Sequence, residues 1–169
     1  FLLAGRHPLA LVVAGSWHYA EGNGWVNRCT IFGARGEVVW QHSKLRRYLA
    51  TAENVAAAPA AFGELGIGPN GGIEAIKQGS SLEYCDTPVG RFSVAICMGF
   101  FHPDVRPGLA ATRADYFLVP AMTASIVDMH RTADDLARNW SATLVANCGV
   151  IGGKKAQCFS RKPSKNERV

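Results

Sequence analysis

The chain has 169 residues, of which 48% are hydrophobic and 18% charged, a balance that predicts one folded domain with a buried core. No apolar run reaches the ~18 residues that a membrane-spanning helix needs, and the first residues lack the pattern of a signal peptide. The five cysteines are widely spaced without a C-x-x-C pair, which argues against a disulfide framework or structural zinc site and favours a reducing, cytoplasmic location.

The net charge of +5 is distributed unevenly along the chain. Residues 1–153 carry 12 basic and 12 acidic side chains, whereas residues 154–169 carry six basic residues and one acidic residue. We therefore predict a neutral domain over residues 1–153, followed by a basic tail or linker over residues 154–169. Nucleic-acid binding is not expected of the neutral domain, and only the tail could contact nucleic acid or an acidic partner.

The first half of the chain predicts short strands joined by glycine-rich turns, at Leu9–Gly15, Trp25–Phe32 and Val38–Gln41. Lys44 comes just after the third of these strands. Taken alone, Lys44 reads as an ordinary surface lysine, because lysine is usually exposed. For residues 48–72, which are rich in alanine and glycine, we expect a short helix and a long loop that is either a binding loop or disordered.

The second half predicts an antiparallel hairpin followed by alternating helices and strands. The hairpin joins Ser81–Asp86 to Phe92–Ile96, and the later elements are a helix at Arg106–Arg113, a strand at Tyr116–Val119, an amphipathic helix at Ser125–Ala142 and a strand at Thr143–Ala146. This order predicts an α/β fold with a mixed sheet and helices on a face of it.

Cys97 falls where the buried strand Phe92–Ile96 stops, and Gly99 permits a sharp turn soon after it. A thiol at the end of a rigid strand is well presented for nucleophilic attack. The competing interpretation is a small core residue, because free cysteine is among the most buried residue types. A papain-like set with His102 and Asp104 is disfavoured, because those residues are too close to Cys97 in sequence. The histidines at positions 7, 18, 42, 102 and 130 lack metal-ligand spacing.

Several further motifs follow one another along residues 9–153. They are VVAGS at 12–16, an Asn27-to-Gly36 hairpin, Lys44 in HSKL, Glu74 ahead of Gly79, Thr87 with Gly90-Arg91, Cys97, ADYFLVP at 114–120 and VANCG at 145–149. This ordered set resembles the nitrilase superfamily of carbon–nitrogen hydrolases. The resemblance implies an α-β-β-α sandwich with a mixed sheet, here incomplete.

The resemblance also implies a mechanism and a set of site residues. Cys97 would attack an amide or nitrile carbon, giving a thioester or thioimidate intermediate. Lys44 would stabilise the developing negative charge together with the backbone N–H of Met98, and Glu74 would hold Lys44 and the substrate in place. The implied enzyme needs no metal or organic cofactor, acts on a small molecule, forms a homo-oligomer and does not bind a membrane.

The sequence departs from the family pattern in three places. The family's general-base glutamate lies farther ahead of the Gly-Ser strand than this chain extends, so we expect it in a missing N-terminal part, and Glu21 is not a substitute. The family's last strands are likewise expected to be cut off. Met98-Gly99 replaces the aromatic and acidic residues that usually follow the nucleophile. In the helix that usually carries Arg-Ala-x-Glu-Asn, only Asn139 remains.

Two functions therefore remain open. The first is a cysteine-dependent carbon–nitrogen hydrolase of the amidase or nitrilase type. The second is an inactive or specialised nitrilase-like module of a larger multidomain protein, serving assembly or regulation. Thiol labelling distinguishes them, because an activated Cys97 reacts below pH 8 and a buried structural thiol does not.

Overall fold

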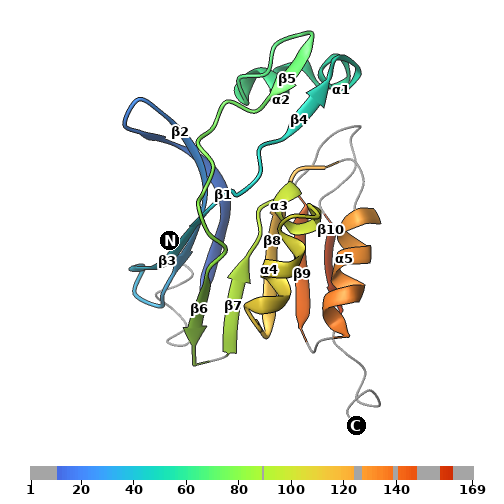
Figure 1. Cartoon of the computed structure of the whole chain (residues 1–169). Coiled ribbons are helices and arrows are strands. Elements are labelled where there is room, and N and C mark those ends of the chain that lie inside the picture. The colour runs from blue at the N-terminus through green and yellow to red at the C-terminus, as the bar shows by residue number, and fades with distance from the viewer. Residues whose placement is uncertain (1–10, 89, 124–126, 139–140, 148–156, 162–169) are drawn as a thin grey trace.

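The computed structural model describes residues 11–88, 90–123, 127–138, 141–147 and 157–161 (Figure 1). A three-stranded antiparallel sheet contains, in spatial order, β1 (Val12–Glu21), β2 (Gly24–Phe32) and β3 (Val38–Ser43). A five-stranded sheet contains, in spatial order, β10 (Gln157–Arg161), β9 (Ala142–Asn147), β8 (Tyr116–Ala121), β7 (Gly90–Val94) and β6 (Tyr84–Thr87). A small third sheet pairs β4 (Leu49–Thr51) with β5 (Gly71–Ile73).

The five-stranded sheet is mixed, as expected. Strands β7, β8 and β9 run parallel, and β6 and β10 add antiparallel edges. The helices are α1 (Ala52–Ala57), α2 (Pro59–Glu64), α3 (Met98–Phe101), α4 (Arg106–Ala111) and α5 (Val127–Ala137). The parallel strands are joined by segments that contain helices, which is the usual way to connect parallel neighbours.

Two hydrophobic clusters define the layers. Between the two large sheets, Cys29 and Ile31 of β2 pack with Val94 of β7 and Leu118 of β8. The opposite face of the five-stranded sheet is covered by α3, α4 and α5, through a cluster that includes Phe100, Leu109, Phe117, Met129 and Leu136. The order of layers is therefore sheet, sheet, helices, and Figure 1 shows the two sheets side by side with α4 and α5 on the far side of the second. The predicted α/β class is confirmed.

The first strand differs from its prediction. We expected it to end at Gly15, but β1 continues to Glu21. Its pairing with β2 shifts register between Val13 and Ser16, and Gly15 has a φ of +78°. Glycine adopts this conformation easily, so a β-bulge absorbs the glycine and the strand continues beyond it. The bulge brings His18 into register opposite Asn27.

The region from residue 48 to residue 72 is folded, not a long loop. Strands β4 and β5 pair in antiparallel register from Leu49 opposite Ile73, and α1 and α2 lie between them. This part has its own small core of Ala50, Val55, Phe62 and Ile67. Thr51 caps α1 in a capping box with Asn54, which fixes where that helix begins. We call residues 49–73 the cap unit; Figure 1 shows it beyond the ends of both large sheets.

The range expected to be a basic tail contributes a strand to the sheet. Residues 157–161 form β10, which pairs with β9 from Gln157 opposite Asn147 to Arg161 opposite Thr143. QCFSR is too short for its periodicity to indicate a strand, so pairing with β9 decides its conformation. The rest of the expected tail, residues 154–156 and 162–169, lies outside the described residues. No helix in the described part of the chain is long and apolar enough to cross a membrane.

Candidate active site

A buried ion pair joins Lys44 and Glu74. Lys44 follows β3 directly and Glu74 follows β5 directly, so the ends of two separate sheets position them. Lys44 Nζ donates to Glu74 Oε2 at 2.6 Å, and the side chains are 5% and 0% exposed. The backbone of Lys44 is fixed on both sides, since its N–H donates to the Asn27 carbonyl and its carbonyl accepts from Gly79. The sequence-based pairing of these two residues is thus present as a contact.

Glu74 accepts three hydrogen bonds. Its Oε2 atom accepts from Lys44 and from the backbone N–H of Tyr48 at 3.0 Å, and its Oε1 atom lies 3.3 Å from His18 Nε2. Burial by itself raises the pKa of Glu74, but the Lys44 charge and the three hydrogen bonds outweigh it and hold the pKa below its ordinary value. Glu74 is therefore an ionised, fully paired carboxylate.

Cys97 occupies a tight turn between the five-stranded sheet and α3. Its backbone N–H donates to the Pro120 carbonyl at 2.8 Å, which extends the contact of β7 with β8 by one more step. Its φ is +50°, in the left-handed region that non-glycine residues avoid, and such a conformation costs about 1–3 kcal/mol. The half-buried thiol packs at the border of both hydrophobic clusters. Helix α3 begins with Met98, whose N–H belongs to the first turn and has no partner within the helix.

Tyr48 lies next to the ion pair. Its N–H donates to Glu74 Oε2, and its own pKa is raised, first by burial and then by the Cys97 charge. Leu45, next to Lys44, belongs to the hydrophobic cluster on which Cys97 packs. Among these described residues, no hydrogen bond joins the Cys97 thiol to Lys44 or Glu74. The structure thus brings Lys44 and Glu74 into contact, and Leu45 beside Lys44 packs in the same hydrophobic cluster as Cys97.

Other acidic and histidine candidates lie elsewhere. Glu21 pairs with Arg28 at 2.6 Å and is about half exposed, so it is separate from the Lys44–Glu74 pair. His102 and Asp104 face each other at 3.7 Å on the surface and form no hydrogen bond with Cys97 within the described chain. Asn139, the remaining family-like position in the last helix, lies outside the described residues, as do Cys148 and Gly149 of the VANCG motif.

Two residues at the site were not predicted from sequence: His18 and Tyr48. The histidine lies two residues beyond Ser16, on the same side of β1 as Ser16, and its partner is 56 residues away. The tyrosine lies four residues after Lys44. Neither position follows a helix or strand repeat that would indicate a site. Both residues contact Glu74, and these contacts form only when the chain brings distant segments together.

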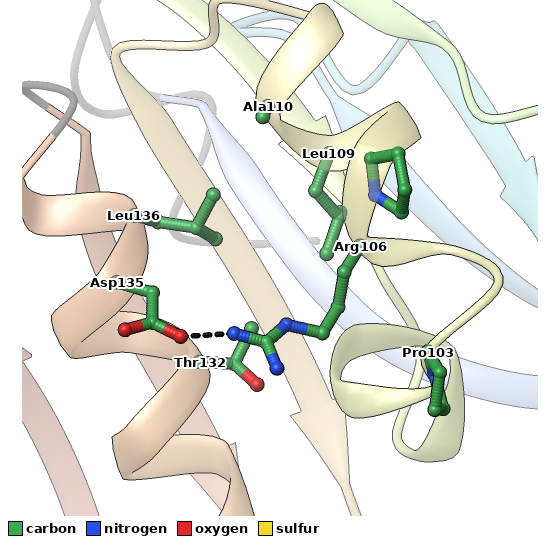
Figure 2. Close-up of a pocket in the computed structure, with 8 residues that line it drawn as sticks. Pro103, Arg106, Leu109, Ala110, Thr132, Asp135 and Leu136 are labelled. Atoms are coloured by element: carbon green, nitrogen blue, oxygen red, sulfur yellow. Dashed lines mark hydrogen bonds and ion pairs between the residues drawn. The ribbon is translucent and has the colours of Figure 1, made fainter.

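Two hollows lie outside this group of residues. One, of about 400 Å³, lies between α4 and α5, where the Arg106–Asp135 ion pair crosses it (Figure 2). The other, of about 320 Å³, is polar and is lined by residues that include Arg28, His42 and Glu83. Neither is lined by Lys44, Glu74 or Cys97.

Comparison with known proteins identifies the fold. A scan against protein-family models gives no match, and a search of curated proteins also gives none. Among solved structures, Nit3 of Saccharomyces cerevisiae, a member of branch 10 of the nitrilase superfamily, matches with a TM-score of 0.67 at 19% identity, over 96% of this chain and 55% of that one. The NitN amidase of Nesterenkonia sp. AN1 matches with a TM-score of 0.65 at 18% identity, over 95% of this chain and 58% of that one.

An E41Q mutant of the Nesterenkonia amidase, with the acetamide moiety of fluoroacetamide added covalently at its active-site cysteine, matches equally well, with a TM-score of 0.65 at 18% identity. It is covered over 56% of its length, and 95% of this chain is covered. The chain thus spans little more than half the length of the solved structures that it matches. The order of its strands and helices and these structural matches agree, and the chain has a nitrilase-like fold.

Proposed function

We propose that this chain carries the nucleophile and the charge-stabilising residues of a carbon–nitrogen hydrolase that acts on an amide or a nitrile. The observation that carries the proposal is the buried Lys44–Glu74 pair, because Leu45 beside Lys44 packs in the same hydrophobic cluster as Cys97, which sits in a strained turn. A buried lysine with a fixed partner is an unusual use of a charged residue, and it is expected where a reaction develops negative charge. The amidases among the structural matches support this reaction class.

In the proposed reaction the Cys97 sulfur attacks the substrate carbon as a thiolate. For an amide, the carbonyl electron pair moves to oxygen, and the Lys44 ammonium and the Met98 N–H stabilise that oxyanion. Its collapse breaks the carbon–nitrogen bond, releases ammonia or an amine that takes up a proton, and leaves a thioester. Water then attacks the thioester, which gives the carboxylic acid and restores the thiol. Losing one oxyanion donor typically costs ~3 kcal/mol, about a hundredfold in rate.

Glu74 has the role of holding Lys44, not of taking the thiol proton. Both of its oxygens already accept hydrogen bonds, and its lowered pKa makes it a weak base. The mechanism therefore requires a second carboxylate as general base. The resemblance to the nitrilase superfamily assigns that role to a glutamate ahead of the Gly15-Ser16 bulge.

The test compares Cys97 with two other thiols of the same chain. Cys29 is buried, which raises its pKa to about 12, and Cys85 is half-buried on edge strand β6. The protein is treated with fluoroacetamide or acrylamide at pH 7, and the modified cysteines are identified by mass spectrometry. We expect Cys97 to be modified at least tenfold faster than Cys85 and Cys29 to stay unmodified until the protein is unfolded. Equal rates at Cys97 and Cys85 would remove the basis for a nucleophilic Cys97.

A second experiment, which measures turnover, addresses the alternative of an inactive nitrilase-like module, which Met98-Gly99 after the cysteine motivates. In the full-length protein, Cys97→Ala should abolish amide or nitrile hydrolysis while the protein keeps its thermal melting profile. A full-length protein that turns over neither class of substrate, with Cys97 no more reactive than Cys85, would favour the module. Hydrolysis that survives in Cys97→Ala would exclude Cys97 as the nucleophile.

A further inference from the structure

His18 contacts the Lys44–Glu74 pair but has no part in the mechanism above. Its Nε2 atom lies 3.3 Å from Glu74 Oε1, on the side of the carboxylate away from the atom that Lys44 and the Tyr48 N–H bind. The side chain of His18 is 29% exposed, whereas that of Glu74 is 0% exposed. His18 is therefore the member of this group that reaches from the buried carboxylate toward solvent.

The direction of the hydrogen bond follows from the charge on Glu74. An ionised carboxylate can only accept hydrogen bonds. Because Glu74 is ionised, the proton between the two groups is on His18 Nε2, which fixes the tautomer of a neutral imidazole. The hydrogen bond from His18 is also one of the contacts that lower the Glu74 pKa.

The three donors reach the carboxylate from two directions. Lys44 and the Tyr48 N–H both donate to Glu74 Oε2. Among the described residues, His18 donates to Glu74 Oε1. A carboxylate held through one oxygen alone can rotate, whereas donors on both oxygens fix its plane. Fixing that plane also fixes the direction from which Glu74 holds the Lys44 ammonium.

The backbone makes this arrangement rigid. His18 lies opposite Asn27 in the register of β1 and β2, and the Asn27 carbonyl accepts the Lys44 N–H at 2.7 Å. Asn27 of β2 is therefore the neighbour of both His18 and Lys44, the two side chains that bind Glu74 from the β1-β2-β3 sheet and its end. The distance between His18 and Lys44 is set by strand pairing and not by flexible loops.

We propose that His18 is a positioning residue, which donates to Glu74 Oε1 and thereby holds the carboxylate so that Lys44 points at the atom that becomes negatively charged during the reaction. The proposal depends on the proposed function for its consequence in catalysis, but the contact itself is testable without any turnover. His18 does not touch the substrate in this role and acts through Glu74.

The experiment uses two variants that differ in whether a donor remains. His18→Gln keeps a side-chain N–H, and His18→Phe keeps a flat ring without one. The Glu74 carboxyl carbon is titrated by NMR in the wild type and both variants, and the rate of Cys97 modification by fluoroacetamide is measured alongside. We expect His18→Phe to raise the Glu74 pKa and to slow Cys97 modification about tenfold. His18→Gln should return the Glu74 pKa toward the wild-type value and the modification rate to within about threefold of wild type.

The outcomes distinguish a failure of the His18 proposal from a failure of the proposed hydrolase function. Should wild-type Cys97 react no faster than Cys85, the proposed function fails, while the Glu74 titration still decides whether His18 holds the carboxylate. Should wild-type Cys97 react rapidly and His18→Phe change neither readout, the positioning role is overturned. Should His18→Phe fail to fold, the nitrogen shifts of the neutral imidazole in the wild-type protein decide: a protonated Nε2 supports the proposal, and a bare Nε2 overturns it.

Discussion

Two ion pairs that differ in exposure connect separate elements of this protein. Lys44 and Glu74 are 5% and 0% exposed and are surrounded by further donors. Arg106 of α4 and Asp135 of α5 are each 45% exposed and bridge two helices at the surface (Figure 2). The first pair is removed from water and the second is in contact with it, so an ion pair has different energetic consequences in the two places.

The difference shows which pair has to be explained by function. An exposed pair contributes 0 to about 1 kcal/mol and is screened by salt. A buried pair has a desolvation penalty that often exceeds the attraction, so well-packed apolar residues in its place are frequently as stable or more stable. Stability therefore does not account for Lys44 and Glu74, and the proposed reaction would give this buried cation a role.

The largest expected effect comes from breaking the buried pair on one side. Glu74→Gln leaves the Lys44 ammonium buried without an opposite charge, and such a loss costs roughly 3–5 kcal/mol of unfolding free energy at neutral pH. Because the Glu74 pKa is lowered in the folded state, its stabilising contribution is present above the ordinary glutamate value of ~4.3 and is lost as pH falls through the folded value. Denaturant unfolding at pH 7 and pH 3 should therefore show the gap between wild type and variant narrowing in acid.

A double variant is the control for that experiment. Lys44→Met with Glu74→Gln removes both charges and keeps an acceptor for the Tyr48 N–H. It should recover most of the unfolding free energy lost in Glu74→Gln. A double variant as unstable as the single one would mean that the pair itself holds the fold together, contrary to the comparison above.

An intermediate effect is expected at His42, which is buried like Lys44 but kept neutral. Burial lowers its pKa to about 4, with Glu83 acting weakly in the opposite direction. Between pH 4 and the ordinary histidine value of ~6.5 the unfolded state binds the extra proton, so stability falls as pH is lowered through this window, by up to ~3 kcal/mol. Unfolding free energies at pH 7 and pH 4.5 in wild type and His42→Gln measure this, and the variant should lose most of that slope.

The smallest effect is expected at the surface pair. Asp135→Asn removes the partner of Arg106 in water, so the unfolding free energy should change by less than about 1 kcal/mol. Fluoroacetamide should modify Cys97 at the wild-type rate, since neither Arg106 nor Asp135 contacts Lys44, Glu74 or Cys97 in the described structure. A loss of several kcal/mol of unfolding free energy would contradict the expectation that the exposed Arg106–Asp135 pair contributes little to stability.

Local pattern was sufficient for the sheet, whereas the Lys44–Glu74 pairing came from the family resemblance. The strands around Cys29, Phe117 and Val94 are apolar, β-prone runs bounded by turn residues, and such runs form strands wherever they are buried. Lys44 and Glu74 were paired by a family-like order of motifs, and their contact is present at 2.6 Å. The roles of Cys97 and Met98 in catalysis stay predictions.

The parts that escaped prediction depend on contacts between distant segments. The bulge at Gly15 carries β1 on to His18, although glycine normally indicates the end of a strand. The glycine-rich segment up to Ile73 reads as a loop until β5 pairs with β4. The strand that begins at Gln157 forms because β9 offers an edge to it. None of these partners can be read from local composition.

The cap unit begins and ends at the same place, because Leu49 and Ile73 are paired neighbours. Between these paired ends, α1 and α2 pack on a small core of their own. Its inner core reaches the site through Tyr48, which stacks on Phe62 with ring centroids 5.9 Å apart. A change in the cap-unit core therefore reaches Glu74 through Tyr48, whereas the Lys44 backbone is held separately by Asn27 of β2 and by Gly79.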